Sequence, residues 1–224
     1  IVTGAGKGIG RQVAIQLATR KVSVALASRT SSDLIALENE IRDGGGVALA
    51  IAPDVSIAAQ VATLVQETSE RLGPVDVLVN NAGVVEPSLL VDMPEESWDR
   101  VLDINLKSAF LCTQGVLPSM IKRHRGRIVN VSSISGRLGT PRLVSYCASK
   151  WGLIGLTKAI AEEVREHNIQ AFAICPGSVD TQMLKRGLPG AEPQMSPEDV
   201  ASTIVYLATE APDAMTGGVI DMFG

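Results

Sequence analysis

The sequence has no excess of positive charge and no apolar stretch long enough to cross a membrane. Its net charge is −4 and its pI is about 5.3, whereas domains that bind nucleic acid usually carry a basic patch or a high pI. The longest mainly apolar runs, such as 75–79 and 128–131, have the length of a strand and fall far short of the ~20 residues that a spanning helix needs. We therefore expect neither nucleic acid nor a membrane as a partner.

Cysteine is scarce, and its spacing matches no known framework. Cys112, Cys147 and Cys175 are odd in number, widely separated and set among apolar residues, so we expect reduced thiols in a cytoplasmic protein rather than disulfides. No CxxC pair or Cys/His spacing typical of a metal site occurs, and we expect no metal. We also expect no signal peptide, and the sequence shows no internal repeat, low-complexity tract or linker.

What the sequence does contain is an alternation of short apolar runs and longer segments with helical periodicity. With 224 residues and 46% hydrophobic content, the chain can bury a sizeable core. Continuous apolar runs are typical of strands covered on both faces, and their alternation with helices predicts an α/β fold with a doubly wound parallel sheet. We expect a single domain, 1–224, of about seven strands with helices on both faces.

Apolar spacing and the glycines and prolines between segments predict the individual elements. Strands are predicted at 22–27, 47–52, 75–79, 127–131, 169–174 and 219–221, and helices from about Gly8, across the segment with Leu34, Leu37 and Ile41, and over 57–72, 94–122, 145–166 and 198–209. Only Ile1 and Val2 precede the first glycines, so we expect the first strand to begin upstream of this sequence. Segment 181–197 has weak periodicity and is interpreted as a mobile loop or short helices.

A glycine-rich stretch separates the first strand from the first helix. It reads Thr3-Gly4-Ala5-Gly6-Lys7-Gly8-Ile9-Gly10. Glycines let the backbone turn sharply and approach a pyrophosphate, whose charge is attracted by the N–H groups and dipole of the following helix. Glycines alone also make plain turns, but the order strand, glycines, helix, strand predicts a dinucleotide site.

The end of the second strand indicates which dinucleotide is bound. NAD-selective sites place an acidic residue there, some ~20 positions after the glycines, where it binds the ribose 2′-hydroxyl. Ser28 and Arg29 occupy this place, and a hydroxyl and a guanidinium bind a 2′-phosphate that a carboxylate would repel. Lys7 could add a second positive contact. The sequence therefore favours NADP(H) over NAD(H), although either base could instead be a solvated surface charge.

Tyr146 and Lys150 are four residues apart on an expected helix and so share one face. A phenol has an ordinary pKa near ~10, and a neighbouring ammonium lowers it. The pair is predicted to act as an acid/base unit, although this spacing alone more often means a half-buried tyrosine beside a solvated lysine. Ser133 lies thirteen residues before Tyr146, and its neighbour Ser132 is expected to face the core or a backbone group.

In combination, these motifs resemble those of the short-chain dehydrogenase/reductase family, and the resemblance covers essentially the whole chain. The matching motifs are Thr3-Gly4-x-x-x-Gly8-x-Gly10, Asn80-Asn81-Ala82-Gly83, Asn105 within 103–106, Ser133, Tyr146-x-x-x-Lys150 and Pro176-Gly177. The pattern is most similar to that of 3-oxoacyl-[acyl-carrier-protein] reductase-like members. The resemblance implies a Rossmann fold and hydride transfer between a nicotinamide dinucleotide and a carbonyl or secondary alcohol.

The resemblance also implies a role for each motif residue. Tyr146 would be the acid/base, and Ser133 would hydrogen-bond the substrate oxygen. Lys150 would bind the nicotinamide ribose and lower the pKa of Tyr146, and Asn105 would hold a water that relays protons to Lys150. Cofactor contacts are implied for Gly4, Lys7, Gly8, Ile9, Gly10, Ser28, Arg29, Asp54, Val55, Asn81, Ala82, Gly83, Tyr146, Lys150, Pro176, Gly177, Val179 and Thr181. For Asp54 a simple turn role is the alternative to an adenine contact.

The sequence leaves the substrate open. We expect an NADPH-dependent ketone or 3-oxoacyl reductase, with a sugar or polyol dehydrogenase and a non-catalytic dinucleotide-binding protein as alternatives. The segment 181–197 is expected to cover the substrate with apolar side chains. The basic run 122–127 could dock an acidic acyl-carrier protein, but basic residues at a helix C-terminus also complement the helix dipole.

Two helical segments, 98–117 and 151–164, carry more apolar surface than one sheet face needs. Family members usually pair these helices across a two-fold axis. We therefore expect a homodimer or, in preference, a homotetramer with closed symmetry.

Overall fold

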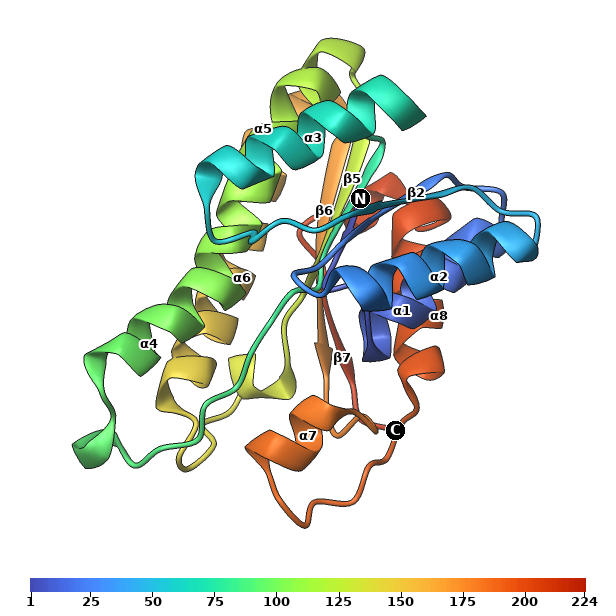
Figure 1. Ribbon diagram of the computed structural model, residues 1–224. Coiled ribbons are helices and arrows are strands. Elements are labelled where there is room, and N and C mark those ends of the chain that lie inside the picture. Colours follow the sequence, from blue (N-terminus) through green and yellow to red (C-terminus); the bar gives the residue numbers. More distant parts are fainter.

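The strands form one parallel sheet, as the computed structural model of residues 1–224 shows (Figure 1). The strands are β1 (Val2–Thr3), β2 (Val24–Ala27), β3 (Ala48–Ile51), β4 (Val77–Asn80), β5 (Gly126–Val131), β6 (Ile169–Pro176) and β7 (Val219–Met222). Their spatial order is β3-β2-β1-β4-β5-β6-β7, and all neighbours pair in parallel. The predicted doubly wound sheet is confirmed. Strands are added toward one edge of the sheet from β1 to β3 and toward the other edge from β4 to β7. The switch point therefore lies between β1 and β4, and such sheets bind ligands there, at the carboxyl ends of their strands.

Helices cover both faces of this sheet (Figure 1). They are α1 (Gly8–Thr19), α2 (Ser31–Asp43), α3 (Ala58–Leu72), α4 (Glu95–Leu102), α5 (Ser108–Arg123), α6 (Val144–Glu163), α7 (Gln182–Gly187) and α8 (Pro197–Thr209). One core joins α1, α2 and α8 to strand residues such as Leu26 and Val129. A second core joins α3, α5 and α6 to the strand neighbours Ala25 and Ile128. Successive strand residues thus face opposite cores, which explains why the strands have no polar face.

The predicted helix 94–122 is not continuous. It consists of α4, a π-helical turn over Asp103–Lys107 and α5. Apolar residues recur at helical spacing on both sides of this turn and Asn105 interrupts them, and the periodicity predicted one continuous helix across it. A π-turn widens the helix by one residue per turn and is frequent at functional sites; here it contains Asn105. The chain leaves α5 through His124, whose φ of 48° is left-handed.

Segment 181–197 contains one short helix, α7, followed by an irregular stretch. Val179, two residues before the segment, and Met195, near its end, form an isolated bridge, so the segment leaves the sheet beyond β6 and returns beside its point of departure. In Figure 1, α7 lies beyond the carboxyl end of β7, apart from the two helical layers. None of the helices has the length and apolar character that crossing a membrane requires.

Candidate functional site

A cleft of about 810 Å³ lies at the carboxyl ends of the strands. Its wall includes the glycine-rich stretch, the ends of β5 and β6, the first turns of α6, and α7. A second pocket of about 200 Å³ adjoins it and lies over the end of β2. The two share Gly4, Gly6, Lys7 and Gly83.

Most of the predicted site residues line one of these two hollows. The large cleft is lined by Gly4, Lys7, Gly8, Ile9, Asn81, Gly83, Ser133, Tyr146, Lys150, Pro176, Gly177, Val179 and Thr181. The smaller pocket is lined by Gly4, Lys7, Ser28, Arg29, Asp54, Val55, Ala82 and Gly83. Gly10 and Asn105 lie behind the walls. A set of residues drawn from almost the full length of the chain therefore meets at one edge of the sheet.

The glycine-rich stretch is packed so closely that side chains are excluded. Gly4 has a left-handed φ of +65°, and a Cβ there would lie 2.8 Å from Asn81 Nδ2. A Cβ on Gly10 would overlap the carbonyl oxygen of Gly4. Asn81 Nδ2 donates to the carbonyl oxygens of Thr3 and Gly4 at 3.0 and 3.3 Å. The Asn81 side chain therefore ties the end of β4 to the loop, in addition to the cofactor contact that the resemblance implies for this residue.

Helix α1 begins directly at the cleft, which its first residues Gly8 and Ile9 line. Its N-cap residue, Lys7, makes no side-chain capping bond, and the first turn contains no acidic residue. The unpaired N–H groups and the helix dipole therefore favour an anion at this end. This geometry fits the pyrophosphate of a dinucleotide.

Tyr146 lies in the first turn of α6 with its side chain buried, only 9% exposed. Its hydroxyl lies 3.8 Å from Met183 Sδ of α7. Burial raises the pKa of Tyr146 to about 12, and hydrogen bonding with Ser133 opposes this in part. The sequence predicted the opposite direction. Desolvation of the phenolate is the largest effect on this pKa, and the Lys150 nitrogen lies 5.5 Å from the ring centroid.

Lys150 is buried one helical turn after Tyr146. Its Nζ donates to the carbonyl oxygen of Val131, at the end of β5, over 2.8 Å. Burial lowers the pKa of Lys150 from 10.5 to about 8. This single bond leaves two N–H donors of the ammonium free.

The adjacent serines at the end of β5 face different partners. Ser132 Oγ donates to the backbone oxygen of Lys150 at 2.9 Å, so the expectation that it faces a backbone group is confirmed. Ser133 lines the cleft and accepts a hydrogen bond from the backbone N–H of Ser135 at 3.1 Å. Because Ser133 Oγ acts as an acceptor there, its own hydrogen remains available to another acceptor.

Asn105 is fully buried, and its amide joins two segments of the site. Its Oδ1 accepts from the Val84 N–H at 2.7 Å, and its Nδ2 donates to the Val84 carbonyl oxygen at 3.0 Å. Nδ2 also donates to Ser149 Oγ at 3.0 Å, which in turn donates to the Tyr146 carbonyl oxygen at 2.7 Å. Asn105 therefore clamps the loop after β4 to α6. Ser149 lies within the Tyr146–Lys150 stretch, but sequence reasoning gave it no role.

Several remaining residues make local contacts as well as lining the hollows. Asp54 Oδ1 accepts from the backbone N–H and hydroxyl of Ser56 at 3.0 and 2.6 Å, and this bonding lowers the pKa of Asp54. The turn role that the sequence left open for Asp54 is thus present. Thr181 Oγ1 caps α7 by accepting from the Leu184 N–H at 3.2 Å. Ser28 Oγ is buried without a hydrogen-bond partner.

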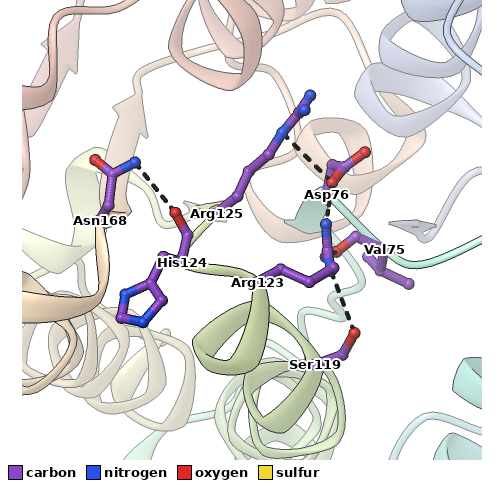
Figure 2. Close-up of polar contacts among 7 residues, drawn as sticks. All are labelled: Val75, Asp76, Ser119, Arg123, His124, Arg125 and Asn168. Atoms are coloured by element: carbon purple, nitrogen blue, oxygen red, sulfur yellow. Dashed lines mark hydrogen bonds and ion pairs between the residues drawn. The ribbon is translucent and has the colours of Figure 1, made fainter.

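The basic run 122–127 lies at the other end of the sheet, where β4 begins (Figure 2). Arg123 Nη1 is 2.5 Å from Asp76 Oδ1, and Arg123 Nη2 donates to the Val75 carbonyl oxygen at 2.6 Å. Arg125 Nε lies 3.6 Å from the same Asp76 oxygen, and Asn168 Nδ2 donates to the His124 carbonyl oxygen at 3.1 Å. These contacts hold the end of α5, and the run is far along the strands from Tyr146.

Known proteins share both the sequence and the fold. The family model described as short chain dehydrogenase matches residues 1–190. The 3-oxoacyl-[acyl-carrier-protein] reductase FabG of Staphylococcus epidermidis is 37% identical over 235 residues, which cover 100% of this chain and 96% of that protein. The enzyme of the same name from Thermotoga maritima is 37% identical over 235 residues, with 100% and 95% covered.

A solved structure extends this similarity to three dimensions. The crystal structure of a short-chain type dehydrogenase/reductase from Mycobacterium marinum superposes with a TM-score of 0.93 at 32% identity, covering 100% of this chain and 92% of that one. With a matching family model, full-length relatives and a common fold, the chain belongs to the short-chain dehydrogenase/reductase family of oxidoreductases.

Proposed function

We propose that the protein is an NADPH-dependent reductase of ketones or 3-oxoacyl compounds. The observation that carries the proposal is that Ser133, Tyr146 and Lys150 line one cleft together with the glycine-rich stretch. When bound, the nicotinamide cofactor supplies the hydride for this chemistry. The residues of the chain then have to position the carbonyl, stabilise charge on its oxygen and deliver a proton.

Tyr146 is the proton donor in this proposal. With a pKa of about 12, its hydroxyl stays protonated across the neutral range, which suits reduction of a carbonyl. Ser133 donates its free hydrogen to the same substrate oxygen as negative charge develops there. Two donors on one oxygen lower the barrier to reduction of the carbonyl.

Lys150 has two tasks in this proposal. One N–H is fixed by the Val131 carbonyl oxygen, and the other two can hydrogen-bond the hydroxyls of the nicotinamide ribose. The positive charge also stabilises the phenolate that Tyr146 becomes after it has given up its proton. Asn105 acts as a positioning residue, because its side-chain donors are committed to Val84 and Ser149.

The smaller pocket supports NADP(H) as the cofactor. The buried, unpartnered hydroxyl of Ser28 can donate to a phosphate oxygen, and Lys7 and Arg29 supply positive charge at the rim of the pocket. Asp54 is turned toward Ser56. The glycine-rich stretch and the start of α1 leave room and N–H donors for the pyrophosphate between the two hollows.

The walls around Tyr146 favour an apolar ketone over a sugar or polyol. The cleft is lined there by Val85, Leu143, Met183, Leu184 and Leu188. A site built for a polyol would need polar groups for each hydroxyl, because unpaired polar groups are costly. The named activity of the two bacterial reductases points the same way. Segment 181–197 would cover such a substrate, whereas the basic run 122–127 does not support docking of an acyl-carrier protein there.

A substrate panel tests this proposal. NADPH absorbance is followed with 3-oxo esters, 3-oxoacyl thioesters and simple ketones, and NADP reduction is followed with sugars and polyols. We expect turnover in the first group. Turnover confined to polyols would select the dehydrogenase alternative, and cofactor binding without any turnover would select a non-catalytic protein. We further infer a cytoplasmic location, since all three cysteines are free thiols.

A further inference from the structure

The smaller pocket contains a carboxylate that neither the sequence motifs nor the proposed reaction uses. Asp33 lies in the first turn of α2 and lines the pocket with Lys7 and Ser28. Its Oδ2 is 3.2 Å from Lys7 Nζ. A Cβ on Gly6 would lie 3.2 Å from Asp33 Cβ and 3.2 Å from Ser28 Oγ. Asp33, Ser28 and Lys7 therefore surround one backbone position of the glycine-rich stretch.

Apart from its place in the first turn of α2, where an acidic residue complements the helix dipole, Asp33 has a single side-chain contact. Helix α2 has no side-chain capping bond, and the Asp33 carboxylate has no hydrogen-bond partner apart from its ion pair with Lys7. The second carboxylate of the pocket, Asp54, differs because it is hydrogen-bonded by Ser56. Asp33 is thus the acidic group whose charge is directed at the Lys7 ammonium.

The ion pair between Lys7 and Asp33 is accessible and weak enough to exchange partners. The Lys7 side chain is 64% exposed and that of Asp33 is 28% exposed. Exposed ion pairs contribute little to stability, so a doubly charged phosphate in the pocket can replace Asp33 as the partner of the Lys7 ammonium. The Asp33 carboxylate would then remain beside that phosphate and repel it.

We propose that Asp33 sets the cofactor preference of this enzyme by competing with the 2′-phosphate of NADP(H) for Lys7. The inference rests on the proposed function and deepens it. On this account, the chain binds NADP(H) less tightly than Ser28, Arg29 and Lys7 alone would allow. Its selectivity against NAD(H) is correspondingly reduced.

Binding of two nucleotide fragments tests this role without any turnover. Adenosine 2′,5′-bisphosphate carries the 2′-phosphate, and AMP lacks it. In calorimetric titrations at low salt, Asp33→Asn should tighten the bisphosphate by about five-fold and leave AMP within about two-fold. In a Lys7→Met background, the gain from Asp33→Asn should shrink, because the ammonium for which the two anions compete is gone.

Glu38→Gln is the matched control. Glu38 lies on the same helix, pairs with Arg42 at 3.2 Å and lines neither hollow, so the substitution makes the same charge change without touching the pocket. It should leave both affinities unchanged. Asp33→Ser serves as a second variant, and thermal unfolding checks that both variants fold.

The outcomes separate the inference from the function on which it rests. Wild-type protein that binds the bisphosphate no more tightly than AMP would contradict the proposed NADP(H) preference itself. A wild-type preference for the bisphosphate that Asp33→Asn leaves unchanged or reduces would overturn the role of Asp33 and leave the NADP(H) proposal standing. Weaker binding of AMP to Asp33→Asn would also overturn the proposed role of Asp33, because the Asp33 carboxylate would then hold the ribose hydroxyl.

Discussion

The two ionisable groups of the catalytic proposal are both buried, and burial moves their pKa values in opposite directions. The pKa of Tyr146 is raised to about 12 and that of Lys150 is lowered to about 8. Near neutral pH, Tyr146 therefore carries its proton and Lys150 its charge. The spacing of Tyr146 and Lys150 predicted that they share one face of a helix. How far each side chain is desolvated depends on the whole fold, so the sequence spacing could not predict the directions of the two pKa shifts.

The pH dependence of reduction follows from these directions. Loss of a proton from Lys150 removes the ammonium, so kcat/KM for ketone reduction should be constant well below the lowered pKa of about 8 and fall as pH rises through it. Lys150→Met should bind NADPH more weakly and lose this limb of the profile. A wild-type profile that stays flat to pH ~10, the ordinary value for a phenol, would contradict the assignment of Lys150.

Among the elements, the glycine-rich stretch and the strand ends could be predicted closely, and the break in the long helix could not. Strands are recognisable as continuous apolar runs, since both faces are buried. At the π-helical turn, the Asn105 amide bonds to Val84 and Ser149, which lie 21 residues before it and 44 residues after it, and periodicity within the segment carries no information on such contacts. Asp33 was missed for a similar reason, because its contact with Lys7 exists only in the folded chain.

The close packing of the glycine-rich stretch predicts that a side chain at Gly10 is not tolerated. Gly10→Ala places a Cβ against the carbonyl oxygen of Gly4, and overpacking of this kind typically costs ~1–3 kcal/mol. We expect a lower free energy of unfolding in urea and weaker NADPH binding. Gly139→Ala is the control, because a Cβ there meets nothing within 4 Å. Equal stability and equal cofactor affinity in the two variants would show that the stretch is not closely constrained.

At the scale of the whole molecule, α5 and α6 each leave one large aromatic side chain exposed. Phe110 of α5 is 45% exposed and Trp151 of α6 is 53% exposed. Gly155 lies one helical turn after Trp151, and a Cβ added there would meet nothing within 4 Å. Large aromatic side chains that are exposed on a monomer surface are typical of an interface.

We therefore expect the protein to form a closed homo-oligomer, a tetramer in preference to a dimer. Trp151→Glu puts a charge into that surface and should shift the sedimentation coefficient toward smaller species at micromolar concentration. Ile35→Glu is the matched change at an exposed residue of α2, 49% exposed, and should leave the assembly intact. A wild-type protein that sediments as a stable monomer would refute this prediction.

The central claim is that Tyr146 delivers the proton to the substrate oxygen, and Tyr146→Phe tests it most directly. The substitution removes only the hydroxyl and keeps the buried ring, so folding and NADPH binding should be retained. Loss of one positioned acid typically lowers the rate by about 10²–10⁴-fold. We therefore predict that NADPH-dependent reduction of a substrate found in the panel falls by this factor while cofactor affinity stays within about two-fold. A Tyr146→Phe enzyme that kept most of its activity would show that another group donates the proton.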